Sequence, residues 1–415
     1  MCQRSTEYSP IRNYTREGRL DIAAQLVHAR TKLGYPQEDV GNALGVSRAM
    51  VSYWESGARR PSDRQLVVLA RLFGVEVGAL LGHKEIETEP DLAEMMFRGE
   101  DTTLSPAAKR GIGEFVRFLD MYAELAEMTN FAIRGTMQSP FGVTQGYDST
   151  DDARRKAEEV RSHLRIGLGP IGDVDLICEL LGITVFRTGL GLDLESAPSG
   201  AFLKHPRVGL SVLANLEMTP GRRRFTVAHE IAHALFHSDR RSFVVSRRTN
   251  DAIERFANVF AGEFLMPTEG IRRTMEEHGF GPRIEDPADV VHLQRFFGVS
   301  YATALVRLRQ ARLLSQGRYQ ELKEIRPVLY AQALGYELSD EEYEQDVDRW
   351  RIRRFPPKFL RLLRIAIVNG DISVGTASTM TGLSIDEVED LLAERSPADA
   401  GTRAALEEFA GIVDA

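Results

Sequence analysis

Cysteine is almost absent from this 415-residue chain, which contains only Cys2 and Cys178. Two cysteines are too few for a disulfide framework, and such scarcity is typical of proteins kept in a reducing compartment. The first residues, Met1 to Thr15, lack the apolar core of a secretory signal peptide. No uninterrupted apolar run reaches membrane-spanning length either. These absences predict a soluble, cytoplasmic protein without a membrane partner.

Positive charge is not in excess, because 52 Lys and Arg face 60 Asp and Glu and the net charge is −8. This balance excludes a generally basic nucleic-acid coat, although an acidic remainder can mask the charge of a small DNA-binding domain. An apolar content of 43% and a charged content of 27% are ordinary for a globular protein. A chain of this length is expected to fold as about two to four domains.

Five short helices are predicted between residues 19 and 82. Pro36 suits the first turn of the second helix, and Gly45 suits a tight turn after it. Ser47 is a good N-cap for the third helix, which is predicted over 48–55. A tight turn between the second and third of five helices describes a helix-turn-helix domain.

This region resembles the Cro and phage-repressor type of helix-turn-helix, often called the XRE family. The matching residues are Gln37 to Ser47, Val51 to Gly57, Arg60-Pro61-Ser62 and Leu66. The resemblance implies that the third helix enters the major groove of double-stranded operator DNA. The DNA-contacting positions that it implies are Gln37, Ser47, Arg48, Ala49, Ser52, Tyr53, Arg59 and Arg60. Arg59 and Arg60 are alternatively a solvated loop pair, and some domains of this kind bind protein instead of DNA.

The region between 83 and 150 is predicted to be a connector. Residues 84–101 are rich in acidic side chains, which indicates a solvated linker. Ser105-Pro106 then opens a long helix whose apolar residues fall on one stripe, up to about Asn130. Such a stripe packs either against the next domain or against a second subunit, and a homodimer is expected.

The sequence His229-Glu230-Ile231-Ala232-His233 lies in a predicted helix that runs from about Gly221 through His237. Two histidines four residues apart share one helix face, so both imidazoles can bind one Zn²⁺. Glu230, beside the first histidine, is placed to act as a general base on water.

A third protein ligand is needed, because a catalytic zinc keeps one position open. His237 is excluded, since on a straight helix it lies about 12 Å from His229; it is predicted to lie behind a ligand or to pack in the core. Glu254, on the next predicted helix, gives the arrangement of zinc peptidases whose third ligand is Glu. Glu263, on that same helix, is the competing choice.

The stretches Arg224 to His237 and Glu254 to Pro267 look like the ImmA/IrrE family of metallopeptidases. The resemblance implies that Zn²⁺ is held by His229, His233 and Glu254. It also implies that Glu230 is the general base of a peptidase. Relatives of this peptidase cleave helix-turn-helix repressors, so the implied substrate is the chain itself, a sister subunit or a separate repressor.

Several neighbours of the site carry further expectations. Asp251 or Asn258 is expected to orient a ligand histidine. The strand predicted at 208–213 either offers its edge to an extended substrate or is an internal strand. The options for a residue that stabilises the transition state are His205, His292 and Tyr301.

The predicted fold is mainly α, in four parts. These are a five-helix helix-turn-helix domain at 19–82, an acidic linker and connector helix at 83–150, an α+β, zincin-like metallopeptidase domain with a small sheet at 151–315, and a helical region at 316–415. The last part is predicted to hold helices at 321–334, 341–350, 358–369, 374–380 and 386–394. Its final helix is too acidic to approach phosphate, which favours a role in interaction or dimerisation.

The leading hypothesis is a DNA-binding transcriptional regulator that carries a zinc endopeptidase, which cuts itself or a partner regulator in a stress or mobile-element response. Two alternatives stay open. In one, the metal domain is a sensor without proteolytic activity. In the other, the helix-turn-helix domain docks a protein substrate for the peptidase.

Overall fold

The computed structural model describes residues 22–32, 35–73, 75, 77–82, 104–131, 133, 139–141, 149–191, 198–238, 243–246, 252–337 and 352–393. The chain divides into two compact units, 1–117 and 118–415. Helices predominate, and a single small sheet lies in the middle of the described chain, so the predicted mainly α fold with a small sheet is confirmed. None of the described helices combines the length and the apolarity that crossing a membrane requires.

Five helices form the N-terminal bundle: α1 (Ile22–Lys32), α2 (Gln37–Leu44), α3 (Arg48–Glu55), α4 (Asp63–Phe73) and α5 (Val77–Leu80). Gly45 adopts a positive φ of 66° between α2 and α3, a conformation that glycine reaches without steric cost. The Ser47 hydroxyl accepts a hydrogen bond from the Met50 backbone N–H and so caps α3. Val51 and Trp54 of α3 are buried in the core of the bundle, which leaves the opposite face of the helix exposed.

The second unit is built around a four-stranded sheet of β1 (Thr184–Thr188), β2 (Gly200–His205), β3 (Gly209–Asn215) and β4 (Phe243–Ser246). The strand order is β1-β3-β2-β4, with β1 parallel to β3 and the other pairs antiparallel. Because β3 pairs on both sides, it has no open edge. The prediction that 208–213 offers an edge to a substrate is therefore wrong, and the internal-strand alternative is correct.

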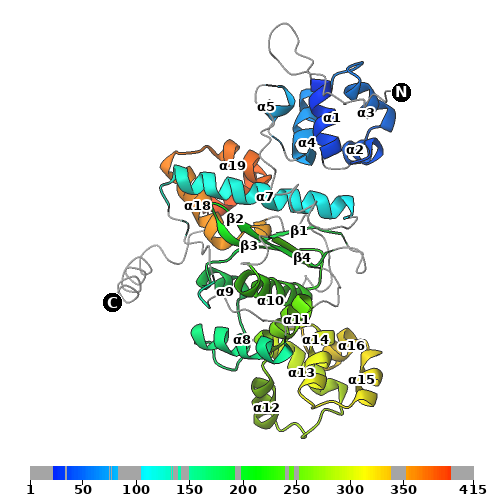
Figure 1. Ribbon diagram of the computed structural model, residues 1–415, viewed down its shortest axis with the longest axis vertical. Helices are drawn as coiled ribbons and strands as arrows, with labels where there is room; N and C mark the ends of the chain where they lie inside the picture. The colour runs from blue at the N-terminus through cyan, green and yellow to red at the C-terminus, as the bar shows by residue number, and fades with distance from the viewer. Residues whose placement is uncertain are drawn as a thin grey trace, which may run out of the picture. The chain divides into compact units, whose positions relative to one another are not determined.

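Four helices lie around the sheet: α7 (Pro106–Met128), α10 (Pro220–Phe236), α11 (Ala252–Leu265) and α18 (Pro357–Asn369). Alternate strand residues face opposite sides. Val212 joins the core that includes α10 and α11, whereas Phe186 stacks on Phe118 of α7 with 4.6 Å between ring centroids. Phe359 of α18 meets Phe118 edge-on at 5.1 Å. The sheet thus lies between α10 on one face and α7 with α18 on the other (Figure 1).

A polar contact fixes the second half of α7 to the sheet. Asp120 accepts a hydrogen bond from Arg207 at 3.1 Å and lies 3.3 Å from His205 Nε2, at the turn between β2 and β3. Burial tends to raise the pKa of Asp120, but the hydrogen bonds and charges of His205 and Arg207 outweigh it and lower the pKa. The apolar stripe of the connector helix therefore packs within its own chain from Phe118 onward.

The remaining helices of the second unit surround this centre. They are α8 (Thr150–His163), α9 (Val174–Leu180), α12 (Thr268–Glu277), α13 (Pro287–Phe297), α14 (Tyr301–Gln310), α15 (Gln316–Lys323), α16 (Pro327–Ala333), α19 (Val374–Thr381) and α20 (Ile385–Ala393). The single helix predicted at 321–334 is wrong, because Pro327 starts a new helix and disfavours helical backbone at the residue before it. The helix predicted at 341–350 and the acidic linker lie outside the described residues.

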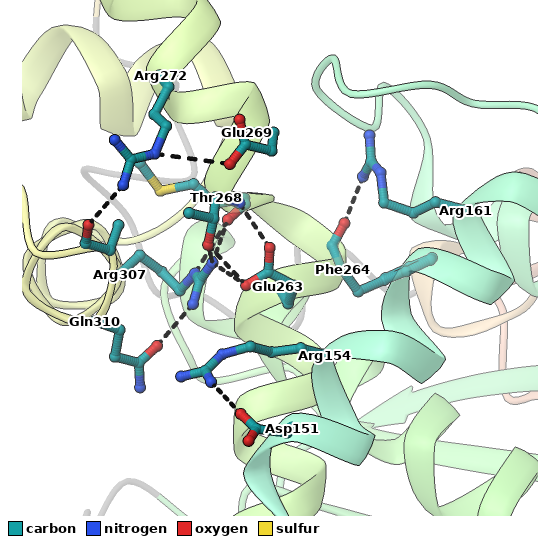
Figure 2. Close-up of polar contacts among 12 residues, drawn as sticks. Asp151, Arg154, Arg161, Glu263, Phe264, Thr268, Glu269, Arg272, Arg307 and Gln310 are labelled. Carbon is teal, nitrogen blue, oxygen red and sulfur yellow. Dashed lines mark hydrogen bonds and ion pairs between the residues drawn. The ribbon is translucent and has the colours of Figure 1, made fainter.

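A buried ion pair joins α11, α12 and α14 (Figure 2). Arg307 of α14 contacts the Glu263 carboxylate near the end of α11, and both side chains are almost fully buried. Glu263 also accepts a hydrogen bond of 2.6 Å from the backbone N–H of Thr268, the first residue of α12. Gly262 leaves room for the arginine, since a Cβ there would lie 2.7 Å from Arg307 Cδ.

Candidate metal centre

Three buried side chains from two helices converge beneath the sheet. His229 and His233 come from α10, and Glu254 comes from the first turn of α11. The two histidine Nε2 atoms are 3.0 Å apart. His229 Nε2 lies 3.2 Å from Glu254 Oε2, and His233 Nε2 lies 3.2 Å from Glu254 Oε1. Among the residues that the structure describes, this is the one group of three His, Cys, Asp or Glu side chains close enough to share a metal ion.

The sequence places these side chains through helix periodicity and close helix packing. Pro220 occupies the first turn of α10, where its missing N–H is not needed. From Thr226 to Phe236 every residue of α10 is buried, so the helix runs through the middle of the unit. Ala257 and Ala261 of α11 are fully buried small residues, which lets the two helices approach each other and brings Glu254 to the histidines.

The donor geometry fits a tetrahedral zinc ion. Ligand atoms about 2.0–2.2 Å from a tetrahedral ion lie about 3.3–3.6 Å from one another. The N–N distance of 3.0 Å and the two N–O distances of 3.2 Å, which reach different oxygens of Glu254, are slightly shorter than this spacing. Two imidazole nitrogens and one carboxylate oxygen also make up a donor set of catalytic zinc sites, which keep a fourth position open.

The electrostatics of the three groups are strongly coupled. Burial tends to raise the pKa of Glu254, but hydrogen bonds from His229 and His233 and their charges lower it to about 2. Burial tends to lower the pKa of His229, but the Glu254 hydrogen bond and the charges of Glu230 and Glu254 outweigh it, so the pKa is raised. The carboxylate is therefore ionised, and a cation held between it and the two imidazoles would be favoured by its charge.

Glu230 lies fully buried beside the cluster and points towards the start of β2. A Cβ on Gly200 would lie 2.8 Å from Glu230 Oε1 and 2.6 Å from the Leu213 carbonyl oxygen. Only glycine at position 200 leaves room for both the carboxylate and the strand pairing. Sequence reasoning missed Gly200, although a glycine inside a strand is a known sign of a close approach by another group.

Each ligand histidine also has a hydrogen-bonding neighbour. His237 Nδ1 lies 2.9 Å from His233 Nδ1, and Asn258 hydrogen-bonds His229. The structure thus places His237 behind His233 and outside the group of three donors. Asp251, the other residue predicted to orient a ligand, lies outside the described residues.

The other residues that the sequence suggested for the site have partners elsewhere in the second unit. Glu263, the competing ligand, pairs with Arg307. The three options for a stabilising residue are also held by other contacts: His205 by Asp120, His292 by the Tyr336 hydroxyl, and Tyr301 by the Leu322 carbonyl oxygen.

The predicted DNA-contacting residues lie mostly on the exposed face of α3 and after it. Arg48, Ala49 and Ser52 are exposed, and Tyr53 is 47% exposed. Exposed Arg59 places its guanidinium 5.7 Å from the centroid of the Tyr53 ring, a cation–π contact. This exposed set is suited to reach base edges and phosphates, and Arg60 and Ser47 are exposed next to it.

Gln37 differs from the other predicted contacts because its amide is used within the domain. Its Nε2 donates to Glu55 Oε2 at 2.9 Å. Arg30 donates to both oxygens of the same carboxylate, which lies at the end of α3. These contacts hold α1, α2 and α3 together and set the direction of α3.

Two family models match parts of this chain. The model described as IrrE N-terminal-like domain matches residues 178–309, and the model described as Helix-turn-helix matches residues 28–80. The first match contains His229, His233 and Glu254 together with Glu230, and the second contains α2, α3 and α4. Both resemblances inferred from the sequence are confirmed.

Curated relatives are similar to parts of this chain. The HTH-type transcriptional regulator PrpR of Mycobacterium tuberculosis is 26% identical over 327 residues, which is 69% of this chain and 62% of PrpR. The radiation response metalloproteases IrrE of Deinococcus radiodurans and Deinococcus deserti are each 36% identical, over 102 and 105 residues. Those matches cover 22% and 24% of this chain and 30% and 36% of the relatives. The chain thus spans less than two thirds of each of these relatives.

Proposed function

We propose that this chain, which carries a helix-turn-helix domain and an IrrE N-terminal-like domain, is a DNA-binding regulator with a zinc-dependent endopeptidase activity. The observation that carries the proposal is the buried group of His229, His233 and Glu254, with Glu230 beside it. In this proposal the helix-turn-helix domain spans 19–82, the connector 83–150, the peptidase domain 151–315 and an interaction region 316–415.

The roles of the four residues follow from their chemistry. His229, His233 and Glu254 would hold Zn²⁺, which supplies Lewis acidity to the scissile carbonyl when it is bound. Glu230 is kept out of the ligand group by its direction towards β2 and is therefore left to move protons. It accepts a proton from the attacking water and passes it to the amine nitrogen that leaves.

The sheet supports a peptide as the substrate. β2 pairs on both sides, so β4 is the outermost described strand on the side of Glu230. Gly200, against which Glu230 packs, is paired with Ser246 of β4. An extended peptide that adds to the outer edge of β4 would lie two strand spacings, about 10 Å, from Gly200 in β2.

At the opposite edge of the sheet, the end of β1 is covered. Arg354 donates to the backbone carbonyl of Arg187 and to the Thr188 hydroxyl, both in β1, and its guanidinium lies 5.5 Å from the centroid of the Phe186 ring. An arginine bonded to the end of an edge strand hinders pairing with another strand at that end. The two edges therefore differ, and only the β4 edge is both near Glu230 and without a described strand partner.

The DNA-binding half of the proposal depends on α3. We propose that Arg48, Ala49, Ser52 and Tyr53 meet base edges, and that Arg59 and Arg60 contact phosphate. A homodimer on a two-fold operator in the cytoplasm would place two peptidase domains near each other. The proposed substrate is accordingly a second copy of this chain, this chain itself or a partner helix-turn-helix regulator, and the proposed setting is a stress or mobile-element response.

The test compares purified wild-type protein with Glu230→Gln. The variant keeps all three donors, so metal analysis is expected to give about one Zn²⁺ per chain in both proteins. Intact-mass analysis is expected to show cut chain or cut partner repressor only with the wild type. Arg48→Ala is the matched control for the other domain, and we expect weaker operator binding with unchanged cutting.

Two outcomes would contradict the proposal in different ways. Wild-type protein that binds zinc and regulates its promoter as Glu230→Gln does, with no cut product under any condition, would favour a sensor without proteolytic activity. Arg48→Ala protein that binds the operator normally but no longer cuts its substrate would favour a helix-turn-helix domain that docks protein.

A further inference from the structure

We infer that His237 is a positioning residue that holds the ligand His233 in the tautomer and ring orientation needed for metal binding. The inference rests on the proposed metal site and deepens it. It starts from the distance of 2.9 Å between the Nδ1 atoms of His233 and His237. Both side chains are fully buried, so the contact is made away from water.

The direction of this hydrogen bond follows from the other nitrogen of His233. His233 Nε2 faces the donor group, 3.0 Å from His229 Nε2 and 3.2 Å from Glu254 Oε1. A nitrogen that binds a metal must present its lone pair, so in the metal-bound state the hydrogen of neutral His233 is on Nδ1. In that state His233 Nδ1–H is the donor, and His237 Nδ1 is the acceptor. His237 in turn carries its own hydrogen on Nε2.

The surrounding structure fixes His237 in this role. It is the C-cap residue of α10, and its backbone N–H donates to the His233 carbonyl oxygen at 2.9 Å. The ring and the backbone of His237 thus both bond the same residue one turn earlier. Phe256 of α11 packs edge-on against the His237 ring with 5.2 Å between centroids. Since Phe256 lies two residues after Glu254, the helix that supplies the third donor also supports this residue.

The second ligand histidine is supported in a comparable way. Asn258 of α11 hydrogen-bonds His229. Ligand histidines are usually oriented by a carboxylate, a backbone carbonyl or water, and loss of such a partner commonly weakens metal binding about 10- to 100-fold. Here the acceptor for His233 is a neutral imidazole, which orients the ligand without adding a negative charge. The geometry therefore assigns His237 a function that its distance from the donor group alone would not indicate.

The experiment compares two substitutions of His237 that differ in hydrogen bonding. His237→Asn keeps an acceptor, because Asn Oδ1 is attached at the same distance along the side chain as His Nδ1. His237→Leu keeps the bulk and removes the acceptor. Phe256→Leu is the matched control, because it disturbs the packing around the His237 ring and leaves the hydrogen bond in place. Full-length proteins are used throughout.

The readouts are the zinc dissociation constant, measured by competition with a chromophoric chelator, and the visible absorption spectrum of the Co²⁺-substituted protein. For His237→Leu we expect zinc affinity to fall about 10- to 100-fold and the Co²⁺ bands to shift. For His237→Asn and Phe256→Leu we expect wild-type Co²⁺ bands and a far smaller change in affinity. Thermal unfolding of each metal-free protein separates these effects from a failure to fold.

Two results overturn the inference. In the first, His237→Leu binds zinc as tightly as the wild type. In the second, His237→Asn and Phe256→Leu lose as much affinity as His237→Leu, which would show that only packing matters. A wild-type protein that binds no zinc would instead contradict the proposed metal site, so the two failures are distinguishable.

Discussion

At the scale of single residues, the candidate site depends on free space as well as on donor atoms. Glu230 is buried between α10 and β2, and the absence of a side chain at position 200 gives its carboxylate room. Thr226, one turn before Glu230, also approaches Gly200: a Cβ there would lie 2.8 Å from Thr226 Cγ2. Gly200 therefore determines where the proposed general base lies.

Gly200→Ala is expected to reduce cleavage much more than zinc binding. The added methyl group would clash with Glu230 Oε1 and with the Leu213 carbonyl oxygen, and relief of the clash displaces the carboxylate or the strand. Overpacking of this kind costs about 1–3 kcal/mol of unfolding free energy. The measurements are the cleavage rate, the zinc content and the unfolding temperature.

Gly169→Ala is the control, because a Cβ at Gly169 meets nothing within 4 Å. We expect this variant to cut its substrate as the wild type does. Equal cleavage by Gly200→Ala and Gly169→Ala would show that the position of Glu230 does not depend on Gly200.

At the residue scale, the sequence predicts which side chains donate to the metal, but it does not predict which residues pack around them. Spacing of four residues on a helix identifies His229 and His233, and the following helix offers Glu254, which the resemblance to the ImmA/IrrE family implies as the third ligand. The same reasoning leaves Glu263 open, because both glutamates lie on one helix and only the fold shows that Glu263 meets Arg307. Side-chain direction depends on partners far away in sequence, so neither the role of Gly200 nor the hydrogen bond of His237 follows from spacing.

At the scale of helices and strands, the site depends on how α11 is held. The first turn of α11 supplies Glu254, and its last turn supplies Glu263, which binds Arg307 and the start of α12. Arg307 also donates to the Met266 carbonyl oxygen at 3.0 Å. The arginine therefore anchors the end of the helix opposite to the proposed ligand.

Arg307→Met is expected to lower the unfolding free energy by about 3–5 kcal/mol, because it leaves the Glu263 carboxylate buried without its counter-ion. The double variant Arg307→Met/Glu263→Gln is expected to be less destabilised, since it removes the buried charge as well. Chemical denaturation of the single and double variants measures the coupling between the two residues. The exposed pair Arg273–Glu277 on α12 is the control, and Arg273→Met is expected to change stability far less.

The sequence predicts helices and strands well where the pattern that defines them lies within the segment itself. Periodicity and caps predict α10, α11 and the helices of the N-terminal bundle within a few residues. Pro327, which divides 321–334 into two helices, carries a local signal that was missed. In contrast, β4 is a strand of only four residues whose partner β2 lies far away in sequence, so its pairing has no local signal. The same non-local pairing decides that β3 is internal.

At the scale of the whole molecule, two compact units divide the proposed tasks. The exposed face of α3 lies in unit 1–117, and the candidate metal centre lies in unit 118–415. The metal donors all come from the second unit, so metal binding should stabilise that unit directly. A ligand that binds only the folded state stabilises it by an amount that grows with ligand concentration.

Zinc is therefore expected to raise the unfolding temperature of the second unit and to leave that of the first unchanged. At a free zinc concentration about 1,000 times the dissociation constant, the added stability is about 4 kcal/mol. Differential scanning calorimetry of the full chain, with zinc and with a chelator, is expected to show two transitions of which only one moves. Operator binding, measured in parallel at room temperature, is expected to be the same in both conditions.

Glu254→Ala is the control, because loss of one donor should abolish most of the zinc-dependent shift in unfolding temperature. A shift of both transitions by zinc, or loss of operator binding on chelation, would instead show that the metal domain controls the DNA-binding domain directly.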